Sequence, residues 1–354
     1  MLRTIGLMSG TSLDGVDAAY LETDGERIGA FGPTLTLPYD DTLRTDLRRL
    51  LTRAPGLDAD DPDLASAVTR LTEAHVAAVR ALGREADVIG FHGQTILHQP
   101  QHRRTWQIGD AEMLAARTGM RVAFDFRSAD VAAGGEGAPL APIYHAALAA
   151  GMAKPLAVLN IGGVANVTFI GRDGTLLAFD TGPGNGPLDD WTSRHTGAAF
   201  DRDGALTRAG QVDRAVLGRL LADPYFARPA PKSLDRLDFA ARLEASGVDQ
   251  LSPADGAATL VAFTAGAVAG AALPERPVRW LVTGGGRRNP AIMGGLAAAL
   301  GVPVAPVETV GWDGDALEAQ CFGFLAARTL AGLPVSFPGT TGVAVPMTGG
   351  QVVG

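Results

Sequence analysis

The chain of 354 residues is poor in cysteine, in charge and in aromatic side chains. Its single cysteine, Cys321, excludes an internal disulfide and a zinc site built on several thiolates, and it is typical of a reducing compartment. Charged residues make up only 19% of the chain, and the formal net charge is −8. An acidic balance argues against general binding to nucleic acid or to anionic membranes. We therefore expect a cytoplasmic protein with no nucleic-acid and no membrane partner.

The sequence also lacks a long run of large apolar residues. The stretch from Gly256 to Pro274 carries no charge and approaches the length of a membrane span. It is rich in Ala, Gly and Thr, however, and Pro274 and Pro277 close it. We predict a buried helix of a globular domain there. The N-terminus does not combine a charged head, an apolar run and a small-residue cleavage site, so no signal peptide is predicted.

Glycine is abundant, and its placement is informative. The 46 glycines and 22 prolines lie between apolar runs, and hydrophobic residues make up 46% of the chain. Many loops around an ample core, in a chain of this length, favour two domains. A strand, a glycine-rich turn and a second strand occur within residues 5–20, and the same order returns within residues 156–170.

This repeat predicts an α/β protein with two duplicated domains and a cleft between them. We place the domains at residues 1–130 and 131–354, with an insertion of short helices at 221–255. Polar turns are expected after strands at 92–95, 106–110 and 180–185. In open α/β sheets, ligands bind at such strand ends.

The glycine turns suit a phosphate. Glycine allows backbone N–H groups to approach a ligand closely, and hydroxyls and an acid add donors and a Mg²⁺ contact. Residues 9–17 have this composition, although a plain hairpin turn explains them equally well. None of the turns matches the P-loop pattern or a clean G-x-G-x-x-G followed by an acid, which disfavours P-loop NTPases and dinucleotide dehydrogenases.

Taken in order, the motifs resemble those of the anhydro-N-acetylmuramic acid kinase family, in the acetate and sugar kinase/Hsp70/actin superfamily. No single motif is decisive, but the ordered set covers nearly the whole chain. The motifs lie at residues 6–17, 92–95, 107–110, 125–127, 137–140, 160–166, 180–185, 229–233 and 284–290.

The resemblance implies two actin-like (ribonuclease H-like) ATPase domains. It also implies a kinase that uses ATP and Mg²⁺ to open 1,6-anhydro-N-acetylmuramic acid with water and to phosphorylate O6, in peptidoglycan recycling. A homodimer is what the family suggests. The sequence departs from the family pattern after Lys232-Ser233, where Leu237 replaces a glutamate.

The resemblance also implies residue roles. Asp180 is matched to the base that activates water, whereas its sequence context alone fits a turn-capping aspartate equally well. We choose Asp14 as a carboxylate near Mg²⁺, in contact through water, with an ordinary turn acid as the alternative. The residues matched to ATP binding are Gly10, Thr11, Ser12, Leu13, Asp14, Gly15, Val16, Asp17, Gly162, Gly163, Gly284, Gly285, Gly286 and Asn289.

Four further residues are candidates for binding the sugar. Arg127 suits a carboxylate because its guanidinium is bidentate, although a surface ion pair is an equal alternative. His92, Gln94 and Asn185 suit hydroxyl or acetamido groups, with turn capping and structural hydrogen bonds as alternatives. Glu318 opens the last strong helix, where an internal polar contact and a direct role are equally compatible with the sequence.

Three other functions stay open at this point. The nearest is a kinase of the same fold that phosphorylates an ordinary sugar hydroxyl, with Asp180 deprotonating that hydroxyl. The second is an actin-like ATPase that binds polypeptides, and the third is a sugar-binding protein without catalysis.

Overall fold

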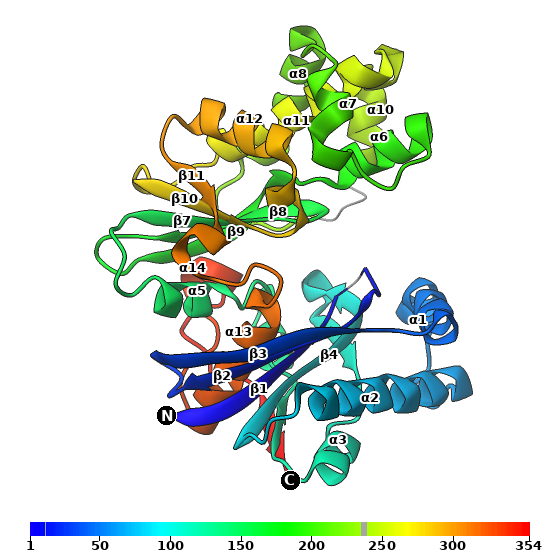
Figure 1. The fold of residues 1–354 in the computed structure, drawn as a ribbon, viewed down its shortest axis with the longest axis vertical. Coiled ribbons are helices and arrows are strands. Elements are labelled where there is room, and N and C mark those ends of the chain that lie inside the picture. The colour runs from blue at the N-terminus through cyan, green and yellow to red at the C-terminus, as the bar shows by residue number, and fades with distance from the viewer. Residues whose placement is uncertain (11, 235–238) are drawn as a thin grey trace. The chain divides into compact units, whose positions relative to one another are not determined.

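The computed structural model describes residues 1–10, 12–234 and 239–354. They form two compact units (Figure 1). Unit 1 comprises Met1–Gly151 and Ala316–Gly354, and unit 2 comprises Met152–Asp315.

Unit 1 is built on a mixed sheet. Its strands run in the order β12-β6-β4-β1-β2-β3, and β5 pairs with β4. The β1–β2 and β2–β3 pairs are antiparallel, whereas β1–β4 and β4–β6 are parallel. The strand bounds are β1 (Leu2–Ser9), β2 (Gly15–Thr23), β3 (Ile28–Pro38), β4 (Val88–Gln99), β5 (Arg104–Ile108), β6 (Val122–Phe124) and β12 (Gln351–Val353).

Helices cover both faces of this sheet. Local signals set their ends: Asp40 accepts the Leu43 N–H at the start of α1, and Gly83 closes α2 in the left-handed conformation. Leu43 and Leu47 are buried on the sheet side of α1. The helix bounds are α1 (Asp41–Arg53), α2 (Pro62–Leu82), α3 (Ala111–Thr118), α4 (Ser128–Ala132), α5 (Pro142–Leu148), α13 (Leu317–Leu330) and α14 (Pro338–Thr341), with single turns η1 (Ala54–Gly56) and η2 (Pro100–His102).

Glycines bring α13 close to the sheet of unit 1. A Cβ at Gly6 in β1 would lie 1.7 Å from the Ala319 carbonyl oxygen, and one at Gly90 in β4 would lie 1.9 Å from the Phe322 carbonyl oxygen. No side chain fits in that space. Residues near the C-terminus therefore complete the core that the N-terminal strands begin.

This packing moves the domain boundary away from the predicted one. We expected a second domain from residue 131 to the C-terminus, but residues 131–151 and 316–354 belong to unit 1. The buried Asp130 carboxylate explains the difference. It accepts hydrogen bonds from the Gly137 N–H (2.7 Å) and from the hydroxyls of Ser336 (2.5 Å) and Thr341 (2.6 Å).

Unit 2 contains a second mixed sheet, in the order β11-β10-β7-β8-β9. Its strands are β7 (Leu156–Ile161), β8 (Val164–Ile170), β9 (Leu176–Pro183), β10 (Arg279–Thr283) and β11 (Val304–Pro306). Its helices are α6 (Gly186–Thr196), α7 (Ala205–Arg208), α8 (Arg214–Leu221), α9 (Pro224–Ala227), α10 (Ala240–Ser246), α11 (Pro253–Ala269) and α12 (Pro290–Leu300), with single turns η3 (Arg202–Gly204), η5 (Val248–Gln250), η6 (Gly285–Arg288) and η7 (Val307–Val310). The short helices α9, α10 and η5 lie in the expected insertion at 221–255.

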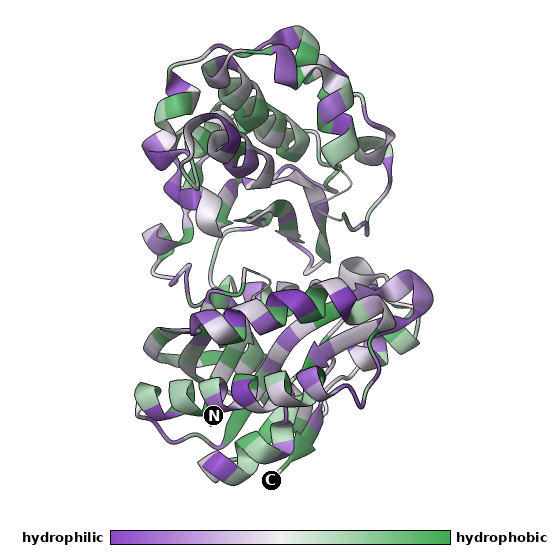
Figure 2. Cartoon of the chain, turned by 90° about the vertical axis from the view of Figure 1, so that its right-hand side faces the viewer, coloured by the Kyte–Doolittle hydropathy of each residue, from purple (hydrophilic) through white to green (hydrophobic). Residues whose placement is uncertain are grey.

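The two sheets share one topology. In each, three antiparallel strands are followed by two strands parallel to the first: β3-β2-β1-β4-β6 in unit 1 and β9-β8-β7-β10-β11 in unit 2. The predicted duplicated α/β fold is therefore confirmed. In Figure 2, helices of both units alternate hydrophilic and hydrophobic residues along their turns, as expected for helices with one face on a core.

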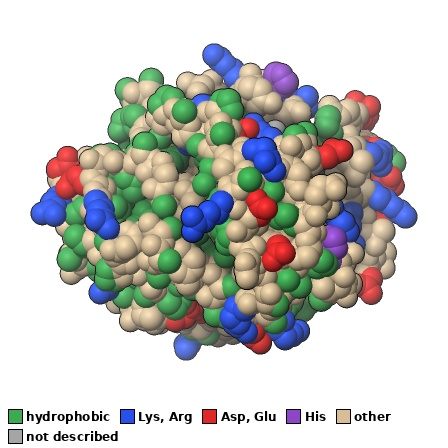
Figure 3. Space-filling model, turned by 90° about the horizontal axis from the view of Figure 1, so that it is seen from above, with side chains coloured by type: hydrophobic (Ala, Val, Ile, Leu, Met, Phe, Trp, Pro, Cys, Tyr) green, Lys and Arg blue, Asp and Glu red, His purple; other side chains and the backbone are tan. Residues whose placement is uncertain are grey.

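The uncharged stretch that begins at Gly256 lies largely in α11, and most of its side chains are buried. Within the described residues, no helix is long and apolar enough to cross a membrane. On the face viewed in Figure 3, acidic and basic side chains are interspersed with hydrophobic ones.

Of the predicted polar turns, the first is in fact a strand and the second is a strand over its first three residues. Residues 92–95 continue β4, which runs to Gln99, and Trp106–Ile108 belong to β5, which pairs with β4. The third, at 180–185, begins inside a strand, since β9 extends to Pro183. Hydrogen bonding across a hairpin keeps such polar residues extended.

Candidate functional site

In unit 1, the turn between β1 and β2 has a strained backbone. Leu13 adopts a positive φ of 59°, which is rare for a residue with a side chain, and its side chain is buried. Its N–H donates to the Gly10 carbonyl (3.1 Å), and its carbonyl accepts from Arg44 Nε (3.1 Å). Strain of this kind is concentrated at ligand clamps and active sites. Thr11 lies outside the described residues.

The candidate ATP residues of this turn differ in exposure. Ser12 and Asp14 are exposed, and a Cβ at Gly10 would meet no atom closer than 3.6 Å. Gly15 instead packs against β3, where a Cβ would lie 2.2 Å from the Leu37 carbonyl oxygen. Val16 is fully buried. The exposed part of the turn, up to Asp14, is therefore the part that a ligand can reach.

Asp17 follows at the start of β2 and faces β3. One of its carboxylate oxygens accepts the Thr36 hydroxyl hydrogen at 2.5 Å. Its side chain is only partly exposed. This contact gives Asp17 a structural partner within the sheet, unlike the exposed Asp14.

Gln94 has a structural partner on the neighbouring strand. Its side chain is fully buried, and its Oε1 accepts the Ser9 hydroxyl hydrogen at 2.5 Å. The Ser9 oxygen in turn lies 2.6 Å from the Tyr39 hydroxyl. Gln94, a candidate for binding the sugar, thus ties β4 to β1 through its amide.

His92 and Arg127 form a pair in unit 1. His92 Nδ1 lies 2.8 Å from the Gly93 carbonyl and donates to it, so Nε2 is the acceptor for Arg127 Nε (3.3 Å) and Nη2 (3.0 Å). Burial, and secondly the charge of Arg127, hold the pKa of His92 well below its usual value. His92 is therefore a neutral hydrogen-bond acceptor that orients Arg127.

Arg127 keeps capacity for an anion. Its Nη1 donates to the Gly137 carbonyl at 2.8 Å, and burial lowers its pKa. Among the described residues, no carboxylate lies within 4 Å of its guanidinium. A guanidinium has five donor hydrogens, and these contacts use only part of them.

A cavity of about 260 Å³ adjoins this pair, and sequence analysis missed several of its polar residues. His92 lines it together with Gln107, Asp125 and Ser128. Asp125 has a positive φ of 54°. The motifs containing Gln107 and Asp125 were recognised, but β-strand pairing was needed to show that they meet.

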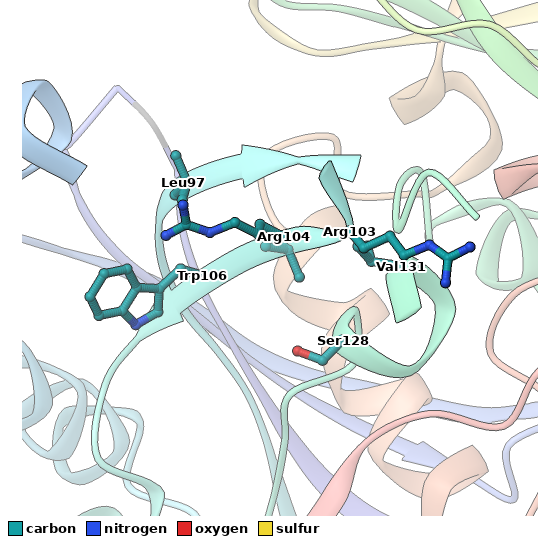
Figure 4. Close-up of a pocket in the computed structure, with 7 residues that line it drawn as sticks. Leu97, Arg103, Arg104, Trp106, Ser128 and Val131 are labelled. Atoms are coloured by element: carbon teal, nitrogen blue, oxygen red, sulfur yellow. The ribbon is translucent and has the colours of Figure 1, made fainter. Parts of the chain in front are cut away.

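A second cavity, of about 220 Å³, shares Thr105, Trp106 and Ser128 with the first. Figure 4 shows the Arg104 guanidinium beside Leu97, whereas Arg103 extends in the opposite direction. Both arginines follow η2 at the β4–β5 hairpin.

In unit 2, the segment 225–234 holds Asp180 in place. The Asp180 N–H donates to the Lys232 carbonyl (3.0 Å), and the Asp180 carbonyl accepts from the Tyr225 hydroxyl (2.6 Å). The carboxylate oxygen Oδ2 accepts the Leu234 N–H at 2.8 Å. Asp180 is thus fixed at its backbone and at its side chain.

Lys232 supports the same segment from inside. Its ammonium donates to the carbonyls of Tyr225 (3.0 Å) and Phe226 (3.2 Å) and lies 4.6 Å from the centre of the Tyr225 ring. Sequence analysis recognised the Lys232-Ser233 motif but did not assign it a role. The atypical residues 235–237 lie outside the described residues.

Asn185 carries a buried acceptor without a partner. Its Nδ2 donates to Asp189 Oδ2 at 2.6 Å, which fixes the orientation of the amide. Its Oδ1 is buried and has no hydrogen-bond partner among the described residues. Such an oxygen suits an N–H or O–H of a ligand.

The glycines after β10 have two kinds of surroundings. A Cβ at Gly284 or Gly286 would lie 2.3 Å from an atom of Asn160 or Ile161, respectively, whereas one at Gly285 would meet nothing within 4 Å. At Gly162, after β7, the nearest atom would be 3.7 Å away. Space beside the backbone is therefore available at Gly162 and Gly285, although the Gly162 N–H already donates to the Val164 carbonyl (3.1 Å). Gly163, the next residue of the turn after β7, is exposed.

Two side chains brace the turn after β10. Arg287 Nη1 donates to the Gly284 carbonyl (3.0 Å), and this arginine also pairs with Glu308 and Asp315. Asn289 caps α12 by accepting the N–H groups of Ala291 and Ile292. The structure thus gives Asn289, a candidate for ATP binding, a helix-capping function.

The described residues contain no group of three or more His, Cys, Asp or Glu side chains that could hold a metal ion by themselves. Mg²⁺ commonly binds through one or two carboxylates together with phosphates and water. The exposed Asp14 fits that kind of site. Glu318, which lies in the first turn of α13, is also exposed.

Fold and site together define a duplicated α/β protein with open glycine turns in both units and a firmly held carboxylate in unit 2. The sequence model of the family described as Anhydro-N-acetylmuramic acid kinase matches residues 2–353. The chain belongs to this family.

Individual relatives agree with the family match. The chain is 64% identical over 352 residues to the anhydro-N-acetylmuramic acid kinase of Acidiphilium cryptum, covering 99% of this chain and 98% of the relative. It is 58% identical to that of Gluconobacter oxydans, covering all of both chains. Among solved structures, component A of (R)-2-hydroxyglutaryl-CoA dehydratase from Acidaminococcus fermentans is 11% identical, with a TM-score of 0.46 over 94% of this chain and 100% of that chain.

Proposed function

We propose that the protein is an ATP-dependent kinase that opens 1,6-anhydro-N-acetylmuramic acid with water and phosphorylates O6, giving N-acetylmuramic acid 6-phosphate in peptidoglycan recycling. Membership of the family along residues 2–353 supports this reaction. The observation that carries it most directly is the fixed position of Asp180. A positioned base is what a weak nucleophile such as water needs.

The reaction needs one protein base, and we assign that role to Asp180. A water oxygen donates an electron pair to the anomeric carbon, and Asp180 takes one of its protons. The bond from the anomeric carbon to O6 breaks, and its electron pair goes to O6. That oxygen takes the γ-phosphoryl group of ATP, and ADP leaves. Because O6 is captured by phosphorus, the leaving group needs no separate acid.

ATP would be held by the open glycine turns. Phosphoryl transfer requires mainly alignment and neutralisation of charge. In unit 1 we assign this to the backbone of Gly10 and Ser12, with Asp14 near Mg²⁺ through water; the ion would neutralise the phosphate charge. In unit 2 we assign adenosine and phosphate contacts to the open space beside Gly162, Gly163 and Gly285.

Two groups are assigned to the sugar. Arg127 has unused donors and no described carboxylate partner, so it suits the lactyl carboxylate. The buried Oδ1 of Asn185 suits a hydroxyl or the acetamido N–H. His92 orients Arg127 in this scheme. We further propose a homodimer, which light scattering of the purified protein would test.

The deciding experiment measures ADP release with the anhydro sugar, with N-acetylmuramic acid and with N-acetylglucosamine. Turnover in ¹⁸O-labelled water should place the label at the anomeric position of the phosphorylated product. A kinase of an ordinary sugar hydroxyl would instead use the open sugars and incorporate no label during turnover.

A further inference from the structure

A row of polar side chains crosses the sheet of unit 2 and ends at Asp180. The strand register places Asn160 of β7 opposite Asn166 of β8, and Asn166 opposite Asp180 of β9. Side chains directly opposite each other point to the same face of a sheet, with Cβ atoms about 5 Å apart. Asn166 is therefore the cross-strand neighbour of the proposed base.

A β-bulge creates this pairing. Ala165 opposes Gly182, but the next residue, Asn166, opposes Asp180, so Thr181 is the extra residue on β9. The Thr181 hydroxyl donates to the Ala165 carbonyl at 3.1 Å. Bulges commonly re-aim side chains next to active sites. In a regular ladder Asn166 would oppose Thr181, and Asp180 would be one position further along.

No hydrogen bond within the described residues gives the side-chain amide of Asn166 a structural role. Within residues 1–10, 12–234 and 239–354 it makes no side-chain hydrogen bond, although its side chain is only partly exposed. Gln94 in unit 1 shows the contrasting case, since its amide is buried and bonded to the neighbouring strand. A half-buried amide beside a carboxylate, without a protein partner, can hydrogen-bond to a ligand or to water.

We propose that Asn166 holds the attacking water beside Asp180. The Asn166 Oδ1 accepts one water hydrogen, and the Asp180 carboxylate accepts the other and takes it as the new carbon–oxygen bond forms. The hydrogen held by Asn166 stays on the oxygen and becomes that of the anomeric hydroxyl. With both hydrogens directed, a water lone pair faces the anomeric carbon. This inference rests on the proposed function.

Kinetics of two variants test it. In Asn166→Ala the water loses one of its two acceptors, and we expect kcat to fall about 30-fold while the KM values for the anhydro sugar and ATP stay within twofold. This loss is smaller than the ~10²–10⁴-fold effect typical of a general base. Asn166→Asp adds a second carboxylate next to Asp180, so the acidic limb of the kcat–pH profile should move to higher pH by about one unit, because like charges raise a carboxyl pKa.

The matched control is Asn160→Ala, which removes the same amide one strand away, where no base lies opposite. Its kcat should stay within threefold of the wild type. Nucleotide affinity and the thermal midpoint of each variant report whether it is folded, and Asn166→Ser offers a second small replacement with the same expected loss of kcat.

The outcomes separate the inference from the function beneath it. A wild-type protein that does not turn over the anhydro sugar overturns both. An active wild type whose folded Asn166→Ala and Asn166→Ser variants keep full kcat overturns only the role of Asn166. So does a tenfold rise in the sugar KM with unchanged kcat, which would make Asn166 a sugar contact.

Discussion

Units 1 and 2 have the same strand order but use polar side chains differently. In unit 1, polar residues of β4 bond to protein partners, as in Gln94 with Ser9 of β1 and His92 with Arg127 before α4. In unit 2, Asn166 has no side-chain partner among the described residues and Asn185 has a buried acceptor without one. The same strand order thus carries an internal polar network in unit 1, in which Arg127 keeps unused donors, and two amides with unpaired acceptors in the described part of unit 2.

The largest expected effect concerns the base in unit 2. Asp180→Asn should lower turnover of the anhydro sugar by about 10³-fold or more, within the range lost with a general base. The amide is isosteric and still accepts the Leu234 N–H, so ATP binding should stay near normal. Coupled ADP release and nucleotide titration measure the two quantities. Activity within a few-fold of wild type would remove Asp180 from the role of base.

Acid should lower the stability of unit 1 more than that of unit 2. His75 is fully buried, and burial lowers its pKa to about 4, whereas an unfolded histidine titrates near 6.5. Between these values the unfolded state binds the extra proton. Stability should therefore be complete above about pH 6.5 and fall by roughly 3 kcal/mol as the pH drops to about 4.

Hydrogen exchange resolved by peptide, between pH 7 and pH 4.5, would show this as earlier loss of protection in α2 than in α11. Unit 2 serves as the contrast, since α11 contains no histidine. A His75→Gln variant should reduce the pH dependence. Equal loss of protection in α2 and α11, unchanged by that variant, would contradict the prediction.

The contact between helix and sheet in unit 1 can be broken by one methyl group. Gly90→Ala should destabilise unit 1 by about 2 kcal/mol, because its Cβ would lie 1.9 Å from the Phe322 carbonyl oxygen and α13 would have to shift. Urea unfolding measures the change. Gly151→Ala, where a Cβ meets nothing within 4 Å, is the control and should be near neutral. A neutral Gly90→Ala would mean that α13 is less tightly seated.

A smaller effect is expected at the support of Asp180. Tyr225→Phe removes the hydrogen bond to the Asp180 carbonyl, which is worth about 1 kcal/mol, so kcat should fall by up to about tenfold with KM unchanged. Tyr20→Phe in unit 1, which removes a hydroxyl contact to the partly exposed Glu22, is the control and should leave kcat unchanged. Equal activities of both variants would show that Asp180 does not depend on Tyr225.

Most of the fold was predictable because strand–turn–strand periodicity is local. The duplication and the main strands and helices followed from apolar spacing, and the family followed from the order of motifs. The domain boundary could not be predicted, because nothing in the sequence around Gly6 and Gly90 shows that α13 packs on them. Residues 92–95 looked like a turn because they are polar, although Gln94 and Thr95 pair with β5 across the hairpin.

Part of the candidate site could likewise be predicted from the sequence, and part could not. Motif order selected Asp180, Asn185 and Arg127, whose surroundings fit a ligand. It missed Gln107 and Asp125, which meet only through the fold. It also missed the neighbourhood of Asn166 and Asp180, because a bulge shifts the register between β8 and β9 by one residue. Register is a property of two segments together, which neither segment encodes alone.

The path of the chain has a consequence for synthesis. Unit 2 is one continuous segment, Met152–Asp315, whereas unit 1 needs α13, which the ribosome makes only after unit 2 is complete. Since domains generally fold as units while the chain emerges, unit 2 is expected to fold first. The strands of unit 1, although made earlier, must wait for α13 with one face of their sheet uncovered. During that interval the nascent chain exposes apolar surface of the kind that chaperones bind.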